Sequence, residues 1–300
     1  MGSAEDVSGH RERLREKLLS NDYTALADYE VLELLLGYVI PRKDTKPLAK
    51  DLIRHFGNLG AVFSAKPEEL KTIKGIKDMA SALIRAVHFA HLHVLDKNMR
   101  KGSVLKTWDQ VLDYYFINIG HISREELRVL YLNAKTEVLA DECISMGSIS
   151  EVPIYPREII DKALKFKATG LILVHNHPSG NPAPSENDIK ATMNLYKTCK
   201  GINLILYNHI IISHLGMTSF RRLRCPPFEN EPYSDLDDAM DLGDYTYYID
   251  TEETKEQETP PAEEKNAVEE KNTQKFKGKT PTEIYNNFLK EYNIVINNKK

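Results

Sequence analysis

The sequence predicts a small all-α domain, a three-layer α/β domain and an acidic tail, over residues 1–97, 105–225 and 226–300. From Arg11 to about Leu95, apolar residues recur at helical spacing. Short β-branched runs alternate with helical segments between residues 127 and 212, which is typical of α/β domains. Beyond Pro226, acidic residues and prolines replace the large aliphatic ones, so we expect disorder over much of the tail.

Two helices of the first domain carry signals for their own ends. The apolar run Glu30–Leu36 stops at Gly37, which favours a helix that ends there. The segment Lys46–Phe56 has a proline near its start and Gly57 just past its end. A further helix start is predicted at Pro67, with Ser64 or Lys66 as its cap, and an amphipathic helix follows through Leu83, Ile84, Val87 and Leu92.

The segment around Gly75 resembles a helix-hairpin-helix, in which a short turn presents backbone N–H groups to a nucleic-acid phosphate. We name Lys74, Gly75 and Lys77 as candidate DNA contacts. The usual form has a second glycine two residues on, where this chain has Lys77, whose side chain hinders a tight turn. The alternative is a helical connector in which Gly75 serves only as a turn.

The α/β domain is expected to begin after a polar, basic linker. We predict helices over Trp108–Phe116, Pro156–Leu164 and Ser185–Lys200, and strands over Leu127–Leu132, Glu137–Ile144, Leu171–His175 and Ile202–Ile212. In the tail, the threonine, proline and glutamate that begin at Thr280 predict a short helix over residues 281–292.

Charge and cysteine content limit the class of protein. The net charge of −4 combines about −12 over residues 229–275 with about +8 elsewhere, so a mildly basic body precedes an acidic tail. A basic body is compatible with nucleic acid but does not establish it. Cys143, Cys199 and Cys225 form no pair pattern, which favours a reduced, cytoplasmic setting. We expect no membrane span and no signal peptide, because no apolar run is long enough.

The chemistry is concentrated where the predicted strand Leu171–His175 ends. His175 and His177 are one residue apart, so they point to the same side of the strand. A loop rich in glycine and proline can return Asp188, in the first turn of the next helix, over that side. Two imidazoles and a carboxylate form a three-ligand zinc set with a fourth position for water, which predicts one catalytic Zn²⁺ per chain.

Simpler explanations exist for each of these residues. A histidine at a strand end is usually packed or hydrogen-bonded. Ser185 with Asp188 three residues later is also a helix-capping pattern, in which the carboxylate favours the positive end of the helix. We interpret His209 and His214 as supporting or structural residues rather than metal ligands.

The conjunction of these residues resembles a known family. His-x-His, seven residues and Ser-x-x-Asp form the zinc signature of the JAMM (MPN/JAB1) metallohydrolases. The longer stretch His175–Asp188 is similar to the RadC family, also described as UPF0758, as are Tyr155–Glu158 and His209–Ile211. The resemblance implies a JAB/MPN fold, related to cytidine deaminases, after a helix-hairpin-helix-like domain. It covers the chain up to about Cys225.

The resemblance also implies roles for individual residues. It implies hydrolysis of an amide, peptide or isopeptide bond in a protein or peptide substrate, with Glu125 as the general base and Ser185 as donor to the oxyanion. Glu126 is the rival base, since a shift of one residue reverses the side-chain direction. One departure is Asn208, where the family commonly has aspartate before the histidine; we expect altered tuning if that position orients a group behind the metal. The alternative function is a DNA-binding repair or recombination protein.

Overall fold

The computed structural model of the chain describes residues 4–20, 26–41, 43–146, 154–231 and 234–242. The chain divides into two compact units, Met1–Lys97 with Ile117–Ile122 and Asn98–Phe116 with Ser123–Lys300, and each has its own hydrophobic core. Among the helices that the structure describes, none is long and apolar enough to cross a membrane.

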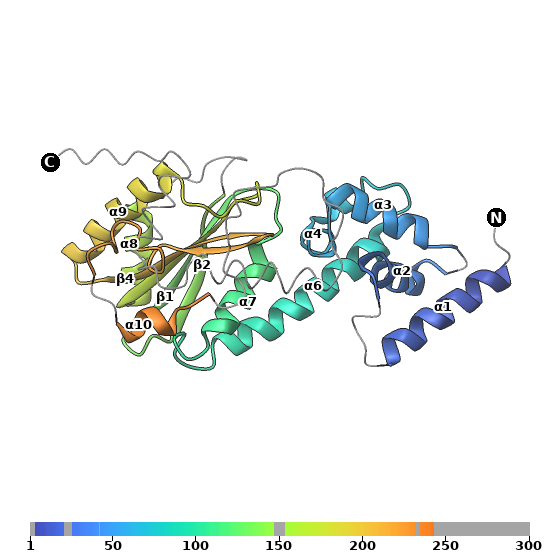
Figure 1. The fold of residues 1–300 in the computed structure, drawn as a ribbon, viewed down its shortest axis with the longest axis horizontal. Helices are drawn as coiled ribbons and strands as arrows, with labels where there is room; N and C mark the ends of the chain where they lie inside the picture. Colours follow the sequence, from blue (N-terminus) through green and yellow to red (C-terminus); the bar gives the residue numbers. More distant parts are fainter. Residues whose placement is uncertain (1–3, 21–25, 42, 147–153, 232–233, 243–300) are drawn as a thin grey trace, which may run out of the picture. The chain divides into compact units, whose positions relative to one another are not determined.

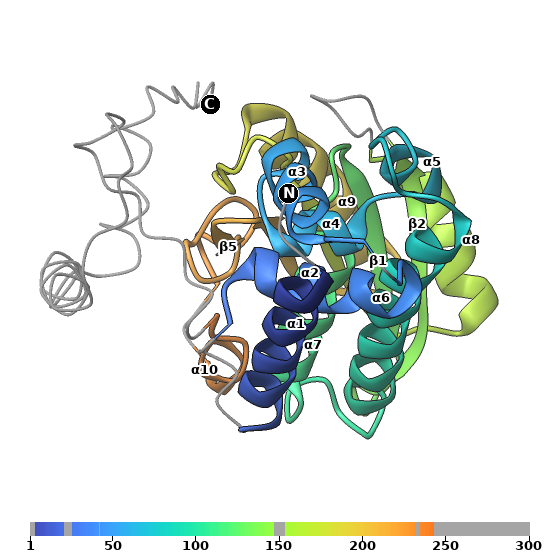
Figure 2. The same ribbon diagram turned by 90° about the vertical axis from the view of Figure 1, so that its right-hand side faces the viewer.

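The first unit is entirely helical in its described part. Its helices are α1 (Ala4–Leu19), α2 (Asp28–Val39), α3 (Lys46–Phe56), α4 (Leu59–Ser64), α5 (Pro67–Leu70) and most of α6 (Asp78–Met99). Helices α2, α3 and α4 pack against one another, as Figure 2 shows, around a core that includes Leu32, Leu52 and Ile84. The predicted ends of α3 are confirmed, with Pro47 in its first turn and Gly57 at φ 94°.

The prediction that a helix ends at Gly37 is wrong, because α2 continues to Val39. Gly37 lies inside the helix, where the guanidinium of Arg11 packs against it and donates to its carbonyl. A β-carbon at Gly37 would lie 3.5 Å from that guanidinium. The glycine therefore provides room for a neighbouring helix and does not serve as a cap.

The second unit, whose sheet is drawn in Figure 1, is built on a five-stranded mixed sheet. The strand order is β2-β1-β3-β4-β5. Its elements are α7 (Trp108–Ile119, of which residues 108–116 belong to this unit), β1 (Glu126–Leu132), β2 (Val138–Met146), α8 (Pro156–Phe166), β3 (Gly170–Asn176), α9 (Glu186–Gly201), β4 (Ile205–Ser213), β5 (Gly216–Ser219) and α10 (Asp235–Ala239). Only β3 and β4 are parallel; the other three pairs are antiparallel. The predicted strands and helices are present, whereas the short strand β5 was not predicted.

Helices cover both faces of this sheet, which confirms the three-layer α/β architecture. On one face, Val129, Leu173 and Ile211 pack with residues of α8 and α9 to form the main core. On the opposite face, the side chain of Arg128 donates two hydrogen bonds to the carboxylate of Asp141, at 3.1 and 2.9 Å. The hydroxyl groups of Tyr114 and Tyr115 on α7 donate to the same carboxylate, at 2.8 and 2.9 Å. The two tyrosine hydrogen bonds attach α7 to the sheet, and the two from Arg128 connect β1 to β2.

The described part of the segment beyond Cys225 is packed onto this unit, although its composition assigns it to the tail. The ring of Phe228 is fully buried in the main core. The carboxylate of Asp237, on α10, lies 3.2 Å from Arg224 and 3.8 Å from Arg221, and all three side chains are buried. The folded domain therefore extends to about residue 242, and the helix predicted over residues 281–292 lies outside the described residues.

Candidate metal centre

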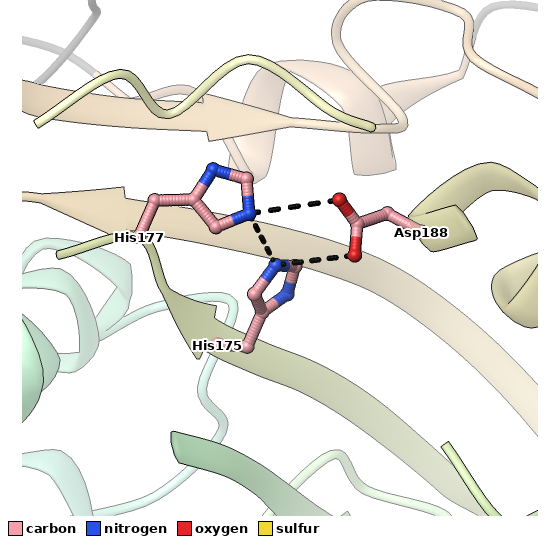
Figure 3. Close-up of side chains that lie close together, drawn as sticks. All are labelled: His175, His177 and Asp188. Carbon is pink, nitrogen blue, oxygen red and sulfur yellow. Dashed lines mark hydrogen bonds and ion pairs between the residues drawn. The ribbon is translucent and has the colours of Figure 1, made fainter. Parts of the chain in front are cut away.

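Two histidines at the end of the central strand β3 point to the same side of the sheet (Figure 3). His175 is paired with Leu127 of β1 and Ile211 of β4, both of which face the main core. The backbone N–H of His177 donates to the carbonyl of Ile212 at 2.7 Å, so the ladder continues past the end of β3. This regular backbone keeps the alternation of side chains, and both imidazoles project toward α9 as the sequence predicts.

Helix α9 supplies the third side chain from its first turn. The carboxylate oxygens of Asp188 lie 3.4 Å from Nε2 of His175 and 3.5 Å from Nε2 of His177. The two imidazole Nε2 atoms are 2.9 Å apart. Figure 3 shows the three groups converging on one point. Within the described residues, they form a cluster whose candidate ligand atoms lie within 4.8 Å of one another and which can hold a metal ion.

Ser185 caps α9 and orients Asp188 at the same time. The backbone N–H of Asp188 donates to the Ser185 hydroxyl at 3.1 Å. In return, the backbone N–H and the hydroxyl of Ser185 donate to Oδ2 of Asp188, at 2.8 and 2.6 Å. The capping explanation of the Ser-x-x-Asp pattern is thus present in the structure, and it is compatible with a metal site because Oδ1 of Asp188 lies outside the capping bonds.

The second nitrogen of His177 is held by the loop that follows β3. Its Nδ1 lies 2.8 Å from the carbonyl oxygen of Asn181. A carbonyl only accepts hydrogen bonds, so Nδ1 carries a proton and, in the neutral ring, Nε2 presents its lone pair to the cluster. The loop is tight there: Gly180 has φ 91°, and a β-carbon would approach the ring of His214 to 2.7 Å. His214 therefore supports the loop by packing.

The donor set fits a metal cation. The Nε2 atoms of His175 and His177 lie 2.9 Å apart, so either a proton or a metal cation must lie between them, and the anionic carboxylate of Asp188 completes the group. Burial opposes ionisation of Asp188, but His175, His177 and Ser185 outweigh it and hold the carboxyl pKa well below its ordinary value. Burial lowers the pKa of His175 to about 4, against the opposing effect of Asp188. A neutral imidazole and an ionised carboxylate are the forms that bind zinc.

The two candidate bases lie on opposite faces of the sheet. Glu126 forms an ion pair with Arg128 at 2.9 Å, on the face that α7 covers. Glu125 precedes it by one residue, which places it on the same side as Leu127 and His175. Burial lowers the pKa of His177, whereas Asp188, the carbonyl of Asn181 and, to a smaller extent, Glu125 raise it. Both glutamates are buried. The geometry therefore favours Glu125 as the carboxylate that faces the cluster.

A buried histidine behind His175 belongs to the site, as the interpretation of His209 as a supporting residue suggests. Nε2 of His209 lies 2.7 Å from Nδ1 of His175, and its Nδ1 lies 2.7 Å from the hydroxyl of Thr192 on α9. Its ring stacks on Phe220 with centroids 4.6 Å apart. Sequence reasoning missed Thr192; its spacing of four residues from Asp188, on the same helix face, is the signal that could have found it.

Asn208 points away from the metal cluster. Its side-chain oxygen accepts from the backbone N–H of His209 at 2.8 Å and of Arg221 at 3.2 Å, and its amide donates to the Ser219 hydroxyl at 2.9 Å. These bonds hold the chain that leaves β5. The substitution of asparagine for the common aspartate thus concerns this turn, and the expectation that it tunes the metal environment has no contact to support it in the described residues.

The three candidate DNA contacts lie together in the first unit. Lys74, Gly75 and Lys77 are all exposed in the turn between α5 and α6. Gly75 has φ 110°, a conformation that favours glycine. Asp78 begins α6 and is paired with Lys71 through a contact of 2.5 Å between Nζ and Oδ1, so its negative charge in this turn is compensated.

Comparison with known proteins identifies the family. Residues 105–225 match the RadC-like JAB domain family, and residues 8–82 match the UPF0758 N-terminal family. The chain is 39% identical over 215 residues to a UPF0758 protein of Ruegeria pomeroyi, and the match covers 72% of this chain and 96% of that protein. These matches confirm the resemblance seen in the sequence: the chain belongs to the RadC (UPF0758) family, with a UPF0758 N-terminal region followed by a RadC-like JAB domain.

Proposed function

We propose that this protein is a zinc-dependent metallohydrolase that cleaves an amide, peptide or isopeptide bond. The observation that carries the proposal is the convergence of His175, His177 and Asp188, with Glu125 placed on the same face of the sheet by strand alternation. JAB-type domains are usually metallohydrolase-like, which agrees with this donor set. Hydrolysis adds the oxygen of water to the carbonyl carbon, breaks the C–N bond and leaves the proton on the departing amine.

The residues of the cluster divide this chemistry between them. Zinc held by His175, His177 and Asp188 would supply the Lewis acidity that lowers the pKa of water from about 15.7 toward about 7. Glu125 would take the proton from water and deliver it to the leaving nitrogen. Ser185 would donate its hydroxyl to the oxyanion, a contribution of about 3 kcal/mol in comparable sites. Its backbone N–H, 2.8 Å from Asp188, would keep that carboxylate oriented when the hydroxyl turns.

Metal analysis and peptide hydrolysis test this proposal on the full chain. We expect about one zinc per wild-type chain, and loss of that zinc in Asp188→Ala. The control is Asp161→Ala, which removes an exposed aspartate of α8 and is expected to retain zinc. Zinc-loaded wild type incubated with a defined peptide library should produce new termini detectable by mass spectrometry. Equal zinc content in wild type and Asp188→Ala, or no cleavage by zinc-loaded wild type, would contradict the proposal.

A second function is favoured by the turn between α5 and α6. Lys74 and Lys77 are exposed on either side of Gly75, whose positive φ permits the tight turn that lets backbone N–H groups approach a phosphate. We propose DNA contact at this turn as a property that is separate from the hydrolytic site. Its test is the salt dependence of DNA binding, because each phosphate contact by a lysine releases counterions.

A further inference from the structure

We propose that Thr192 and His209 are positioning residues that determine which nitrogen of His175 carries its proton, so that the lone pair of Nε2 faces the metal. This inference rests on the proposed function, because it concerns the same metal centre. Three contacts form a chain from His175 to His209, from His209 to Thr192, and from Thr192 to the backbone carbonyl of Asp188.

Which atom donates in each of these three hydrogen bonds follows from the number of protons that the hydroxyl and the two imidazoles carry. The Thr192 hydroxyl lies 2.5 Å from the carbonyl oxygen of Asp188, and a carbonyl can only accept. The single hydroxyl proton is therefore used in that bond. Nδ1 of His209 lies 2.7 Å from the same hydroxyl oxygen, so the imidazole must be the donor there. A neutral His209 then has no proton on Nε2.

Counting protons in the same way assigns the donor in the hydrogen bond between His209 and His175. His209 is fully buried, and its two nitrogens contact a hydroxyl and another imidazole rather than a carboxylate, so a charged ring would lack a directly bonded counter-charge. Its Nε2 is therefore an acceptor, and Nδ1 of His175, 2.7 Å away, donates to it. With its proton on Nδ1, neutral His175 presents a bare Nε2 toward His177 and Asp188. The arrangement is the one that a metal ligand requires.

The chain of hydrogen bonds also connects three elements of the fold. It starts at His175 on β3, passes through His209 on β4 and returns to the backbone of Asp188 on α9. Metal-binding histidines usually donate to a carboxylate or carbonyl, which can only accept. Here the acceptor is an imidazole that could hold its proton on either nitrogen, so it needs an orienting partner of its own. Thr192 is that partner.

Thr192→Val removes this partner while keeping the shape of the side chain. Nδ1–H of His209 then has no acceptor. Moving the proton to Nε2 removes this unpaired buried donor, and the bond between the two rings is kept with its direction reversed, from Nε2–H of His209 to Nδ1 of His175. The proton of His175 would then lie on Nε2, where the metal binds. We expect zinc affinity to fall about 10–100-fold, the usual cost of losing a group that orients a metal ligand. Thr192→Ser retains the hydroxyl and should restore most of the affinity.

The same helix offers a matched control. Thr198 is exposed, and its hydroxyl donates to the carbonyl of Asn194 at 2.9 Å, the same spacing of four residues as between Thr192 and Asp188. Thr198→Val therefore removes an equivalent bond between hydroxyl and helix, without an imidazole in contact. We would measure zinc affinity by competition with a chromophoric chelator on the full chain. Imidazole ¹⁵N NMR of metal-free protein would report the tautomers of His175 and His209.

In wild type, we expect the Nδ1–H tautomer for both His175 and His209. Among Thr192→Val, Thr192→Ser and Thr198→Val, only Thr192→Val should bind zinc more weakly. In that variant, His209 should change to the Nε2–H tautomer. An Nε2–H tautomer of His209 in wild type would overturn the proposal, even if Thr192→Val fails to fold. Equal zinc affinity of Thr192→Val and Thr198→Val would also overturn it. Failure of the hydrolase proposal would give a different result from these two outcomes. Zinc would bind and the histidines would have the predicted tautomers, but no peptide would be cleaved.

Discussion

The assignment of Glu125 as the general base is tested by a pair of neighbouring substitutions, Glu125→Gln and Glu126→Gln. Both remove one negative charge from a buried side chain without changing its size. They act on opposite faces of the sheet, because Glu126 is paired with Arg128 whereas Glu125 precedes Leu127 by two residues and so lies on the face of His175. We therefore expect one variant to lose hydrolysis and the other to lose stability.

The structure indicates the size of each effect. A positioned proton-transfer group typically contributes 10²–10⁴-fold to a rate, so Glu125→Gln should lower peptide hydrolysis by about that factor. Glu126 accepts from Arg128 at 2.9 Å, and a hydrogen bond between charged groups contributes about 1.5–3 kcal/mol. Since Arg128 retains Asp141 as a partner, we expect the lower end of that range for Glu126→Gln. At about 2–4 °C per kcal/mol, its Tm should fall by about 3–6 °C.

Three measurements on each variant decide the matter: zinc content, cleavage of the peptide library and thermal unfolding. Both variants should retain zinc, because neither glutamate belongs to the ligand cluster. Glu125 is not the base if Glu125→Gln cleaves peptides at the wild-type rate. Glu126 is the base instead if Glu126→Gln is folded and zinc-loaded but inactive.

Three further predictions concern DNA binding and stability. Lys74→Glu and Lys77→Glu should each weaken DNA binding at low salt and lower the salt slope by about 1, and unchanged affinity in gel-shift titrations would exclude a contact at that turn. Burial lowers the pKa of His88 to about 4, below its ordinary value of 6.5. The unfolded chain therefore takes up the proton first, and stability present above pH 6.5 should fall by about 3 kcal/mol by pH 4. Urea unfolding at both pH values should show this loss in wild type and not in His88→Gln; equal acid sensitivity would contradict it. Tyr115→Phe removes a bond of 2.9 Å to the Asp141 carboxylate and should cost about 1.5–3 kcal/mol of unfolding free energy, whereas an unchanged Tm would show that this bond does not hold α7.

Local patterns in the chain were sufficient for most helices and strands of the described residues. The ends of α3 follow from Pro47 and Gly57, because caps depend on residues adjacent in sequence. The same holds for the metal cluster: alternation along β3 places His175 and His177 on one face, and the first turn of α9 is only a short loop away. The sequence alone therefore determined which side chains form the candidate site.

Tertiary structure decided what those local patterns leave open. Gly37 looks like a helix end until the side chain of Arg11, from another helix, is seen to occupy the space beside it. Glu125 and Glu126 differ by one residue, and only the register of β1 against β3 shows which face each side chain takes.

The tautomers of His175 and His209, behind the candidate metal cluster, depend on tertiary structure in the same way. His175 and His209 are 34 residues apart in the chain, yet their rings meet because β3 and β4 pair in parallel. Thr192 reaches the same histidine from α9. The sequence by itself determined the candidate ligands, because they depend on short-range alternation and capping. The tautomer of His175 depends on hydrogen bonds between three separate elements, which only the folded chain brings within about 3 Å of one another.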